Sequence, residues 1–277
     1  MNPETREFAI DLARQAGDLL LVTLARGLDA RRTRAKAGHY DIVTEADEAS
    51  ERLLVAALRG RFPGHCIHAE ESAGREIPAC EWLWLIDPVD GTTNFAHGLP
   101  VFAVNLALAR HGAPVLAVTH DPSAGRTYWA EQGGGAWVRA AGQDQRLHVS
   151  SVNDLASALL STGFIANRVL GADRNRAEFS ALDLKSQAVR RFGSAAVIMA
   201  WVAAGHLEAY WEAGLKPWDL AAGWLLITEA GGRVTDYDDG PMRLNSPHMI
   251  ASNGQPGVHR EIMATLAAIH RRQASGA

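Results

Sequence analysis

Apolar side chains recur at helical spacing along the first part of the chain. After Asn2, an apolar residue returns every three or four positions over residues 3–26, which predicts an amphipathic helix ending near Gly27. A second helix is predicted to begin at residues 44–47, Thr-Glu-Ala-Asp, because this sequence matches a capping box. Asp47 therefore has a purely structural explanation as the acid of that capping box.

Shorter apolar runs bounded by turn residues predict a sheet. Residues 65–69 favour a short strand, and residues 82–86 have the length and composition of a buried strand. The glycines at 133–135 neither match GxGxxG nor open a helix, so we expect a turn there and not a phosphate cradle. The runs that predict an antiparallel meander are residues 101–108, 115–118, 127–130 and 136–139.

The pattern changes at residues 147–153 from successive strands to mixed helices and strands. This change indicates one α/β layered unit over residues 1–277 with two lobes, an N-terminal lobe of residues 1–147 and a C-terminal lobe of residues 148–277. In the second lobe we expect a strand at 158–162 and helices at 175–182, 194–204, 221–230 and 260–273.

Composition narrows the class of protein. Of 277 residues, 47% are hydrophobic and 21% are charged, as in an ordinary globular protein, and the net charge of -4 argues against direct nucleic-acid binding through a basic surface. The apolar run at residues 195–205 is shorter than the roughly 20 residues that span a membrane. Residues 1–6 do not resemble a secretory signal. Cys66 and Cys80 lack metal-site spacing, so we expect both to be reduced in a cytoplasmic protein.

The predicted strand at residues 82–86 ends in two carboxylates. Charges at the mouth of an apolar strand are costly to desolvate unless something pairs with them, and residues 82–95 contain no Lys or Arg. Mg²⁺ prefers oxygen ligands, and this stretch offers four in Asp87, the Val89 carbonyl, Asp90 and the Thr92 hydroxyl. A tight turn with Asx capping explains the same residues, and the stretch alone leaves both interpretations open.

Two further acidic positions have a structural and a functional interpretation. Glu70 and Glu71 follow a predicted strand, where neighbours point to opposite sides, so one of them can face a site; we favour Glu70 over an exposed acidic loop end. Asp219 precedes the helix expected at 221–230, where a negative charge either caps the helix or binds a metal beside a phosphate.

Several motifs, in order along the chain, carry a family resemblance. They are Lys36, residues 41–47, Ala69-Glu70-Glu71-Ser72, Asp87-Pro88-Val89-Asp90-Gly91-Thr92-Thr93-Asn94-Phe95, Gly193-Ser194-Ala195-Ala196, Trp218-Asp219-Leu220-Ala221-Ala222-Gly223 and Glu229-Ala230-Gly231-Gly232. The chain resembles the inositol monophosphatase family, within the superfamily of Mg²⁺-dependent, lithium-sensitive sugar phosphatases. The resemblance implies an αβαβα sandwich of the inositol monophosphatase and fructose-1,6-bisphosphatase type, and a homodimer.

The resemblance also implies hydrolysis of a phosphate monoester with two or three Mg²⁺ ions. One ion is expected at Glu70, Asp87, the Val89 carbonyl and Thr92, and a second at Asp87, Asp90 and Asp219. By the same analogy, Glu70 and Thr92 orient the attacking water and Asp47 holds the Thr92 hydroxyl. Lys36 is expected near the phosphate or a third ion.

For the substrate, the resemblance implies a phosphorylated polyol or sugar. The residues expected to line its site are Asp90, Gly91, Thr92, Gly193, Ser194, Ala195, Glu212 and Asp219. Glu212 would accept hydrogen bonds from vicinal hydroxyls of the substrate. From the sequence alone, it could equally be an exposed acid in a loop without a functional role. The leading hypothesis is an inositol-1-phosphatase. The alternatives are a sister phosphatase for histidinol phosphate or fructose 1,6-bisphosphate, and a regulatory protein that binds the transcription machinery.

Overall fold

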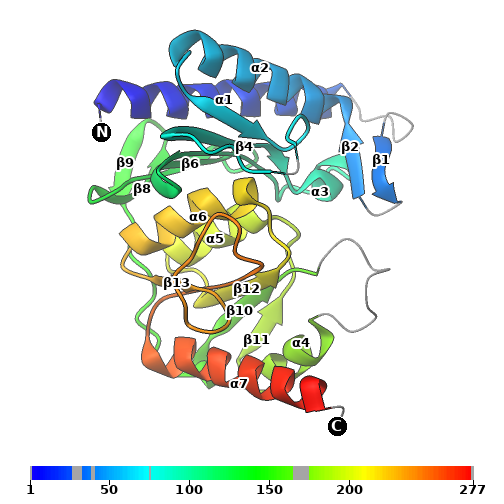
Figure 1. Cartoon of the computed structure of the whole chain (residues 1–277), viewed down its shortest axis with the longest axis vertical. Helices are drawn as coiled ribbons and strands as arrows, with labels where there is room; N and C mark the ends of the chain where they lie inside the picture. The colour runs from blue at the N-terminus through cyan, green and yellow to red at the C-terminus, as the bar shows by residue number, and fades with distance from the viewer. Residues whose placement is uncertain (1, 27–32, 39–40, 75, 165–174, 276–277) are drawn as a thin grey trace.

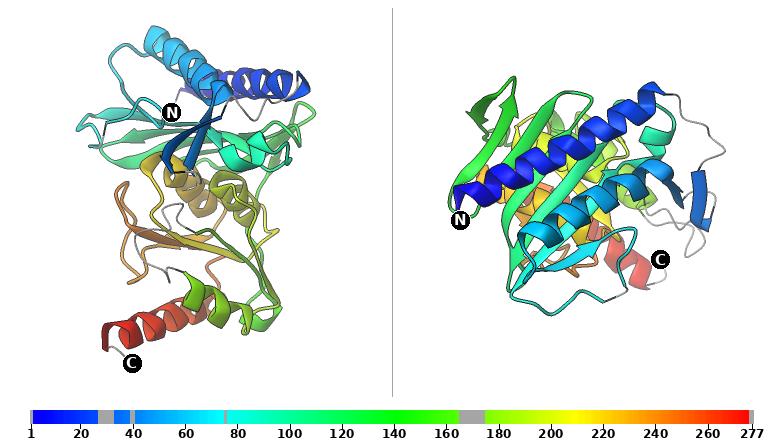
Figure 2. Two further views of the ribbon diagram at one scale, coloured as in Figure 1. Left: turned by 90° about the vertical axis from the view of Figure 1, so that its right-hand side faces the viewer. Right: turned by 90° about the horizontal axis from the view of Figure 1, so that it is seen from above.

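The structure, a computed structural model, describes residues 2–26, 33–38, 41–74, 76–164 and 175–275; for 33–38, 41–43 and 273–275 it describes the backbone alone. The described residues stack in five alternating layers of helix and sheet (Figure 1). This αβαβα sandwich is the predicted fold class. Seen edge on, the same layers run from the N-terminal helices to the C-terminal helix (Figure 2).

The first layer consists of α1 (Pro3–Ala25) and α2 (Glu45–Arg61), which cross one face of the first sheet (Figure 2). Asn2 caps α1 by accepting a hydrogen bond from the Glu4 N–H at 3.1 Å. Thr44 caps α2, and the predicted capping box with Asp47 is present. Both helices therefore begin, and α1 also ends, close to where local sequence signals place them.

Within the described residues, the first sheet has seven strands in the order β3-β4-β5-β6-β7-β8-β9. β3 and β4 run parallel, and every later neighbour is antiparallel, so the predicted meander is confirmed. β9 was not foreseen. The strands are β3 (Cys66–Ala69), β4 (Trp82–Asp90), β5 (Ala103–Arg110), β6 (Ala113–Asp121), β7 (Arg126–Glu131), β8 (Gly135–Ala140) and β9 (Gln143–Arg146).

The glycine turn between β7 and β8 has no role as a phosphate cradle in this structure. The N–H groups of Gly133 and Gly135 both donate to the Glu229 carboxylate, each at 2.8 Å. An acid of the chain itself thus takes the donors that an anion would use, which agrees with the turn predicted from the sequence.

The middle layer consists of α5 (Ala195–Ala203) and α6 (Pro217–Glu229), which lie between the two sheets (Figure 1). Both are apolar on nearly all sides because sheet residues cover both faces, as expected for helices in the centre of a sandwich. The buried helix predicted at residues 194–204 is confirmed. Among the described residues no helix combines the length and apolarity needed to cross a membrane.

The second sheet, counted over the described residues, has five strands in the order β11-β10-β12-β14-β13. They are β10 (Leu159–Thr162), β11 (Ala188–Arg190), β12 (Ala209–Ala213), β13 (Arg233–Thr235) and β14 (His248–Ser252). The outer helices α4 (Arg176–Asp183) and α7 (Pro256–Ser275) cover its far face (Figure 1). The remaining elements of the described residues are the β1 (Thr33–Gly38) and β2 (Asp41–Thr44) hairpin, α3 (Thr92–Ala96) and the short 3₁₀ helix η2 (Leu155–Ser157).

The chain passes from the first sheet to the second between β9 and β10, where the sequence pattern also changes. Yet α6 packs its apolar side chains against Leu83, Leu85 and Ala107 of the first sheet. One core thus joins residues from both sides of the predicted boundary, and the division into lobes of residues 1–147 and 148–277 stays a prediction.

The expectation that both cysteines are reduced was wrong. Cys66, the first residue of β3, forms a disulfide with Cys80, 14 residues later and just before β4. Because β3 and β4 are parallel neighbours, the chain between them must return to the end of the sheet at which β3 began. Sequence spacing could not show this return, since a disulfide depends on distance in the fold.

Candidate metal centre

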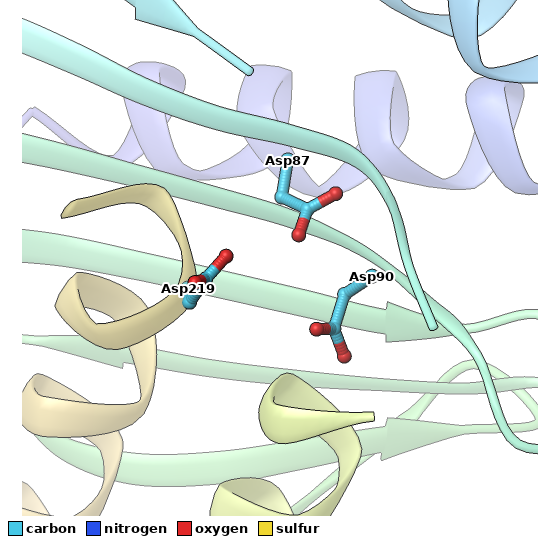
Figure 3. Close-up of side chains that lie close together, drawn as sticks. All are labelled: Asp87, Asp90 and Asp219. Atoms are coloured by element: carbon cyan, nitrogen blue, oxygen red, sulfur yellow. The ribbon is translucent and has the colours of Figure 1, made fainter. Parts of the chain in front are cut away.

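Three carboxylates from two distant segments meet where the first sheet faces the start of α6. Ligand oxygens of Asp87, Asp90 and Asp219 all lie within 4.8 Å of one another. Asp87 and Asp90 project from β4 towards the helix turn that carries Asp219 (Figure 3). The arrangement brings together all three of the acids predicted for the second ion.

A bulge in β4 puts Asp87 and Asp90 on the same side of the sheet. The sequence predicted that the strand stops before Asp87, but β4 continues through Asp90. Asp87 pairs with Asn105 and Asp90 pairs with Ala103, so β4 has one residue more than β5 between these pairs. Three positions apart on a regular strand, the two acids would point to opposite faces; the extra residue restores a common face. Pro88 has no N–H to donate and is tolerated in such a bulge.

The strand ends at a glycine that no other residue replaces without strain. Gly91 has a φ of +89°, in the left-handed region. A Cβ there would lie 3.0 Å from the Val101 carbonyl and 3.2 Å from the Gly193 carbonyl. Gly91 therefore lets the chain turn sharply next to the start of α5 and begin α3 with Thr92.

Asp219 takes part in the cap of α6 and also belongs to the carboxylate cluster, while its role as a metal ligand stays a prediction. It occupies the third position of α6, after Lys216 at the cap, and one of its oxygens accepts a hydrogen bond from the Lys216 N–H at 2.7 Å. The cap itself is thus three residues earlier than the sequence suggested. A carboxylate in the first turn is stabilised by free N–H groups and the helix dipole, while it still contributes an oxygen to the cluster.

The cluster brings like charges together in a buried place. Burial, followed by the charge of Glu70, raises the pKa values of Asp87 and Asp219 well above the usual value. Burial also raises the pKa of Asp90 to about 6, against hydrogen bonds from Ser194 and Ala196 that lower it. Within the described part of the chain none of the three acids forms an ion pair with Lys, Arg or His. Oxygen donors in an unneutralised group of this kind fit a hard divalent cation such as Mg²⁺.

Glu70 lies beside this cluster, as predicted. It follows β3, and its N–H donates to the Ile86 carbonyl at 3.0 Å, next to Asp87. A side-chain hydrogen bond and the negative charge of Glu70 both raise the pKa of Asp87. The N–H of the adjacent Glu71 instead donates to the Glu51 carboxylate at 2.7 Å.

Asp47 also has both of its proposed roles. Its Oδ2 accepts hydrogen bonds from the N–H of Thr44, at 2.9 Å, and from the Thr44 hydroxyl, which complete the capping box. Its Oδ1 accepts a hydrogen bond from the Thr92 hydroxyl at 3.0 Å. The Thr92 oxygen lies 3.0 Å from the Val89 carbonyl as well, so these two predicted ligands are neighbours. Burial raises the pKa of Asp47, although its bonds with Thr44 and Thr92 lower it.

The start of α5 is joined to the cluster through Asp90. The Ser194 hydroxyl and the N–H groups of Ala195 and Ala196 all donate to the Asp90 carboxylate, the last two at 3.2 and 2.9 Å. Gly193 precedes them in a left-handed conformation with φ of +81°. The sequence assigned Gly193, Ser194 and Ala195 to the substrate and did not foresee their bond with Asp90, although an acid at a helix start is a favourable pairing.

Glu212 is not an exposed loop acid. It lies on β12, partly buried, and its carboxylate accepts a hydrogen bond from the hydroxyl of fully buried Tyr210. Burial raises the pKa of Glu212 to about 7. Tyr210 was missed, although residues two apart on a strand share a face and the pair could have been found that way. The side chain of Lys36, on β1, lies outside the described residues.

The layers and the acidic cluster together define the class of metal-dependent phosphatases to which the sequence motifs pointed. The sequence model of the inositol monophosphatase family matches residues 1–274, and the chain belongs to this family. It is therefore a phosphatase. Membership of this family also agrees with the fold, because solved structures of the family superpose on the αβαβα layers of this chain.

Similar proteins include both enzymes and proteins named for another role. An inositol-1-monophosphatase of a Synechocystis species is 40% identical over 82% of this chain and 77% of that protein. A protein of Pseudomonas aeruginosa named Nus factor SuhB is 41% identical over 88% of this chain and 90% of its own length. A solved structure of an IMPase from Thermotoga maritima superposes with a TM-score of 0.86 at 34% identity, covering 97% of this chain and 99% of that one.

Proposed function

We propose that this protein hydrolyses an inositol phosphate to myo-inositol and inorganic phosphate with Mg²⁺ bound at Asp87, Asp90 and Asp219. The observation that carries the proposal is the convergence of these three carboxylates without a basic partner among the described residues. Relatives named inositol-1-monophosphatase, at 40% and 38% identity, support the choice of substrate.

The proposed ligands follow the prediction from the sequence motifs. Glu70, Asp87, the Val89 carbonyl and Thr92 would hold one ion, and Asp87, Asp90 and Asp219 would hold a second, with two or three ions in all. When bound, Mg²⁺ supplies positive charge for the phosphoryl oxygens and acidifies a water molecule. Without it, the acids repel a phosphate dianion, so activity should depend on the cation.

The side chains around the cluster have separate tasks in this proposal. The Thr92 hydroxyl donates its proton to Asp47, which leaves its oxygen free to accept a hydrogen bond from the attacking water. Glu70 accepts the other proton of that water and so fixes its orientation. Asp47 acts through Thr92 and does not touch the substrate.

Substrate recognition is proposed on the side of the cluster formed by the C-terminal half. Glu212, held by Tyr210, accepts hydrogen bonds from vicinal hydroxyls of the polyol. Asp90, Gly91, Thr92, Gly193, Ser194, Ala195 and Asp219 line the rest of the site, with Lys36 near the phosphate. A bidentate carboxylate acceptor favours a substrate with two adjacent hydroxyls over one with a single hydroxyl.

Phosphate release from a panel of substrates tests the proposal most directly. The panel contains inositol 1-phosphate, histidinol phosphate and fructose 1,6-bisphosphate, each with and without Mg²⁺ and with added Li⁺. We expect Mg²⁺-dependent turnover of inositol phosphate that Li⁺ inhibits. Selective turnover of histidinol phosphate or of the bisphosphate would replace this substrate with one of the alternatives.

A role in the transcription machinery is the second candidate, because relatives at 36–41% identity are named Nus factor SuhB. The two roles are compatible, since binding to a protein complex does not require the acidic cluster. Co-purification with transcription complexes, using the wild type and Asp219→Asn in parallel, separates them. Retained binding by the inactive variant supports an independent second role, and no binding by the wild type rejects it.

We also propose a homodimer in the cytoplasm. Phosphorylated polyols are charged and cross membranes poorly, so their hydrolysis is expected inside the cell, although the Cys66–Cys80 disulfide does not support this location as reduced cysteines would. Light scattering coupled to size-exclusion chromatography measures the oligomeric state. Cell fractionation measures the location, and thiol labelling before lysis shows whether Cys66 and Cys80 are joined there.

A further inference from the structure

A row of polar side chains crosses the first sheet on the face that packs against the start of α6. Asp87 on β4 is directly opposite Asn105 on β5, and Asn105 is directly opposite Thr119 on β6. Opposite residues of antiparallel strands point to the same face, so all three lie on the side that α6 covers. Their exposed fractions are 2%, 1% and 0%.

On the side away from the acidic cluster, this row borders an apolar core. Two positions before or after its members, the same strands carry Leu85, Ala107 and Ala117, which all belong to the core packed against α6. A buried amide or hydroxyl in such a core is destabilising unless its hydrogen bonds are made. The row therefore calls for an explanation that apolar packing does not give.

The hydrogen bonds of Asn105 connect the sheet to the helix. Thr119 donates from its hydroxyl to Asn105 Oδ1 at 2.6 Å, which leaves the Asn105 amide nitrogen facing α6. That nitrogen donates to the Trp218 carbonyl at 2.8 Å. Trp218 is joined by a peptide bond to Asp219, so Asn105 holds the backbone that carries this acid.

Asp87 and Asp219 belong to different layers, and their like charges repel one another across the cluster. A direct bond from the strand beside Asp87 to the residue before Asp219 opposes their separation. We propose that Asn105 is a positioning residue of the metal centre, which keeps Asp219 at the distance from Asp87 that a shared cation requires. The inference rests on the proposed metal centre and adds to it a residue whose side-chain hydrogen bonds go to Thr119 and the Trp218 carbonyl and not to the acids.

Groups that orient metal ligands typically change metal affinity about 10–100-fold when they are removed. We therefore expect Asn105→Leu, which is similar in size and cannot form either bond, to raise the Mg²⁺ dissociation constant by about 10-fold or more. Titration calorimetry on the purified full chain without substrate measures this constant. At high Mg²⁺ concentrations kcat should recover towards the wild-type value, because the ligands themselves are intact.

Asn253→Leu is a matched control. Asn253 is also 1% exposed, and its amide also donates to a backbone carbonyl, that of Val152 at 2.8 Å. Both variants lose the hydrogen bond from a buried side-chain amide to a backbone carbonyl and should lower the melting temperature in EDTA. Only the Asn105 variant should lose Mg²⁺ affinity. Equal dissociation constants for the two variants would reduce Asn105 to an ordinary buried polar residue and overturn the inference.

A milder pair of variants keeps the test decisive if the leucine variants do not fold. Asn105→Ser retains a hydroxyl for Thr119 but is too short to reach the Trp218 carbonyl, and Asn253→Ser is its control. We expect Asn105→Ser to weaken Mg²⁺ binding by a smaller factor than leucine, and a change below about twofold contradicts the inference. Failure of the wild type to bind Mg²⁺ would instead refute the proposed metal centre.

Discussion

Two groups of acids in this protein carry opposite electrostatic signatures. At the proposed metal centre, burial raises the pKa values of Asp87 and Asp219 well above normal. At the far end of the first sheet, Glu7 and Asp144 both bind Arg139, at 2.6 and 2.8 Å, and the Arg139 hydrogen bonds lower the pKa values of both acids. The acids differ in their counter-charge and their exposure, and not in their chemistry.

The difference shows why an acidic cluster must be judged together with its neighbours. Arg139 is paired with Asp144 across β8 and β9, and Glu7 is bound by Arg6 at 3.0 Å as well as by Arg139, so two bases neutralise two acids in a partly exposed group. The metal centre gathers negative charge beneath a helix start and, in the described residues, supplies no base for it. The first arrangement joins surface elements, whereas the second has the donors and the unbalanced charge on which the proposed cation site rests.

The largest effect is expected when a carboxylate of the metal centre loses its charge. Asp219→Asn keeps an oxygen that can accept the Lys216 N–H bond, so the helix start should survive, but it removes one negative charge from the cluster. We expect kcat/KM to fall by about 100-fold or more at fixed Mg²⁺. Steady-state phosphate release measures it. Near-full Mg²⁺-dependent activity in this variant, or in Asp90→Asn, would show that these acids do not hold the cation.

Cation binding should also stabilise the fold. A ligand present at 100 times its dissociation constant adds about 2.7 kcal/mol to the free energy of unfolding. We expect Mg²⁺ to produce an increase of that size in chemical denaturation of the wild type, and EDTA to reverse it. Asp144→Asn should show the same increase, while Asp219→Asn should lose most of it. An equal response in all three proteins would mean that Mg²⁺ acts elsewhere.

Opposite pKa shifts predict opposite pH dependences. The pKa of Asp90 rises from 3.8 to about 6 on folding, so the folded protein binds more protons in that interval and the metal-free protein should lose stability as pH rises from about 4 to 6. The lowered pKa values of Glu7 and Asp144 stabilise the fold above their unfolded values, and this contribution is lost as pH falls through their folded values.

Denaturation across this pH range, with EDTA or with Mg²⁺, separates the two groups. Each pKa unit corresponds to about 1.4 kcal/mol, so the decrease should be on the order of 1 kcal/mol or more. Because Mg²⁺ binds the ionised carboxylates, saturating Mg²⁺ should remove the decrease or reverse its sign. A metal-free protein that gains stability between pH 4 and 6 would contradict the raised pKa of Asp90.

The smallest effect is expected in the neutralised group. Asp144→Asn removes one of two acids from Arg139, but Asp144 is 32% exposed and Glu7 remains bound. We expect a loss below about 1 kcal/mol in the free energy of unfolding and no change in Mg²⁺-dependent activity. A fall in activity comparable with that of Asp219→Asn would remove the distinction between the two groups.

Local signals in the sequence predicted most elements, since they depend on neighbours along the chain. The capping box at Thr44 and Asp47 and the apolar periodicity of α1, α5 and α7 are of this kind. The bulge in β4 escaped prediction because it depends on pairing with β5, and the Cys66–Cys80 disulfide escaped because it depends on the parallel pairing of β3 and β4. Motif order identified the candidate acids, but not Tyr210 beside Glu212 or Asn105 beneath Asp219.

The sequence by itself determined the kind of chemistry, because the type and order of Glu70, Asp87, Asp90 and Asp219 already indicate oxygen ligands for a hard cation. Tertiary structure alone decided that the carboxylates of Asp87, Asp90 and Asp219 lie within 4.8 Å of one another, since strand pairing and the packing of α6 bring together residues far apart in the chain. It also decided that, among the described residues, these three acids have no basic partner, whereas Glu7 and Asp144 share Arg139. The sequence determines which residues are charged. The electrostatic energy of each charge depends on its distance to a counter-charge, and this distance is set only when the chain folds.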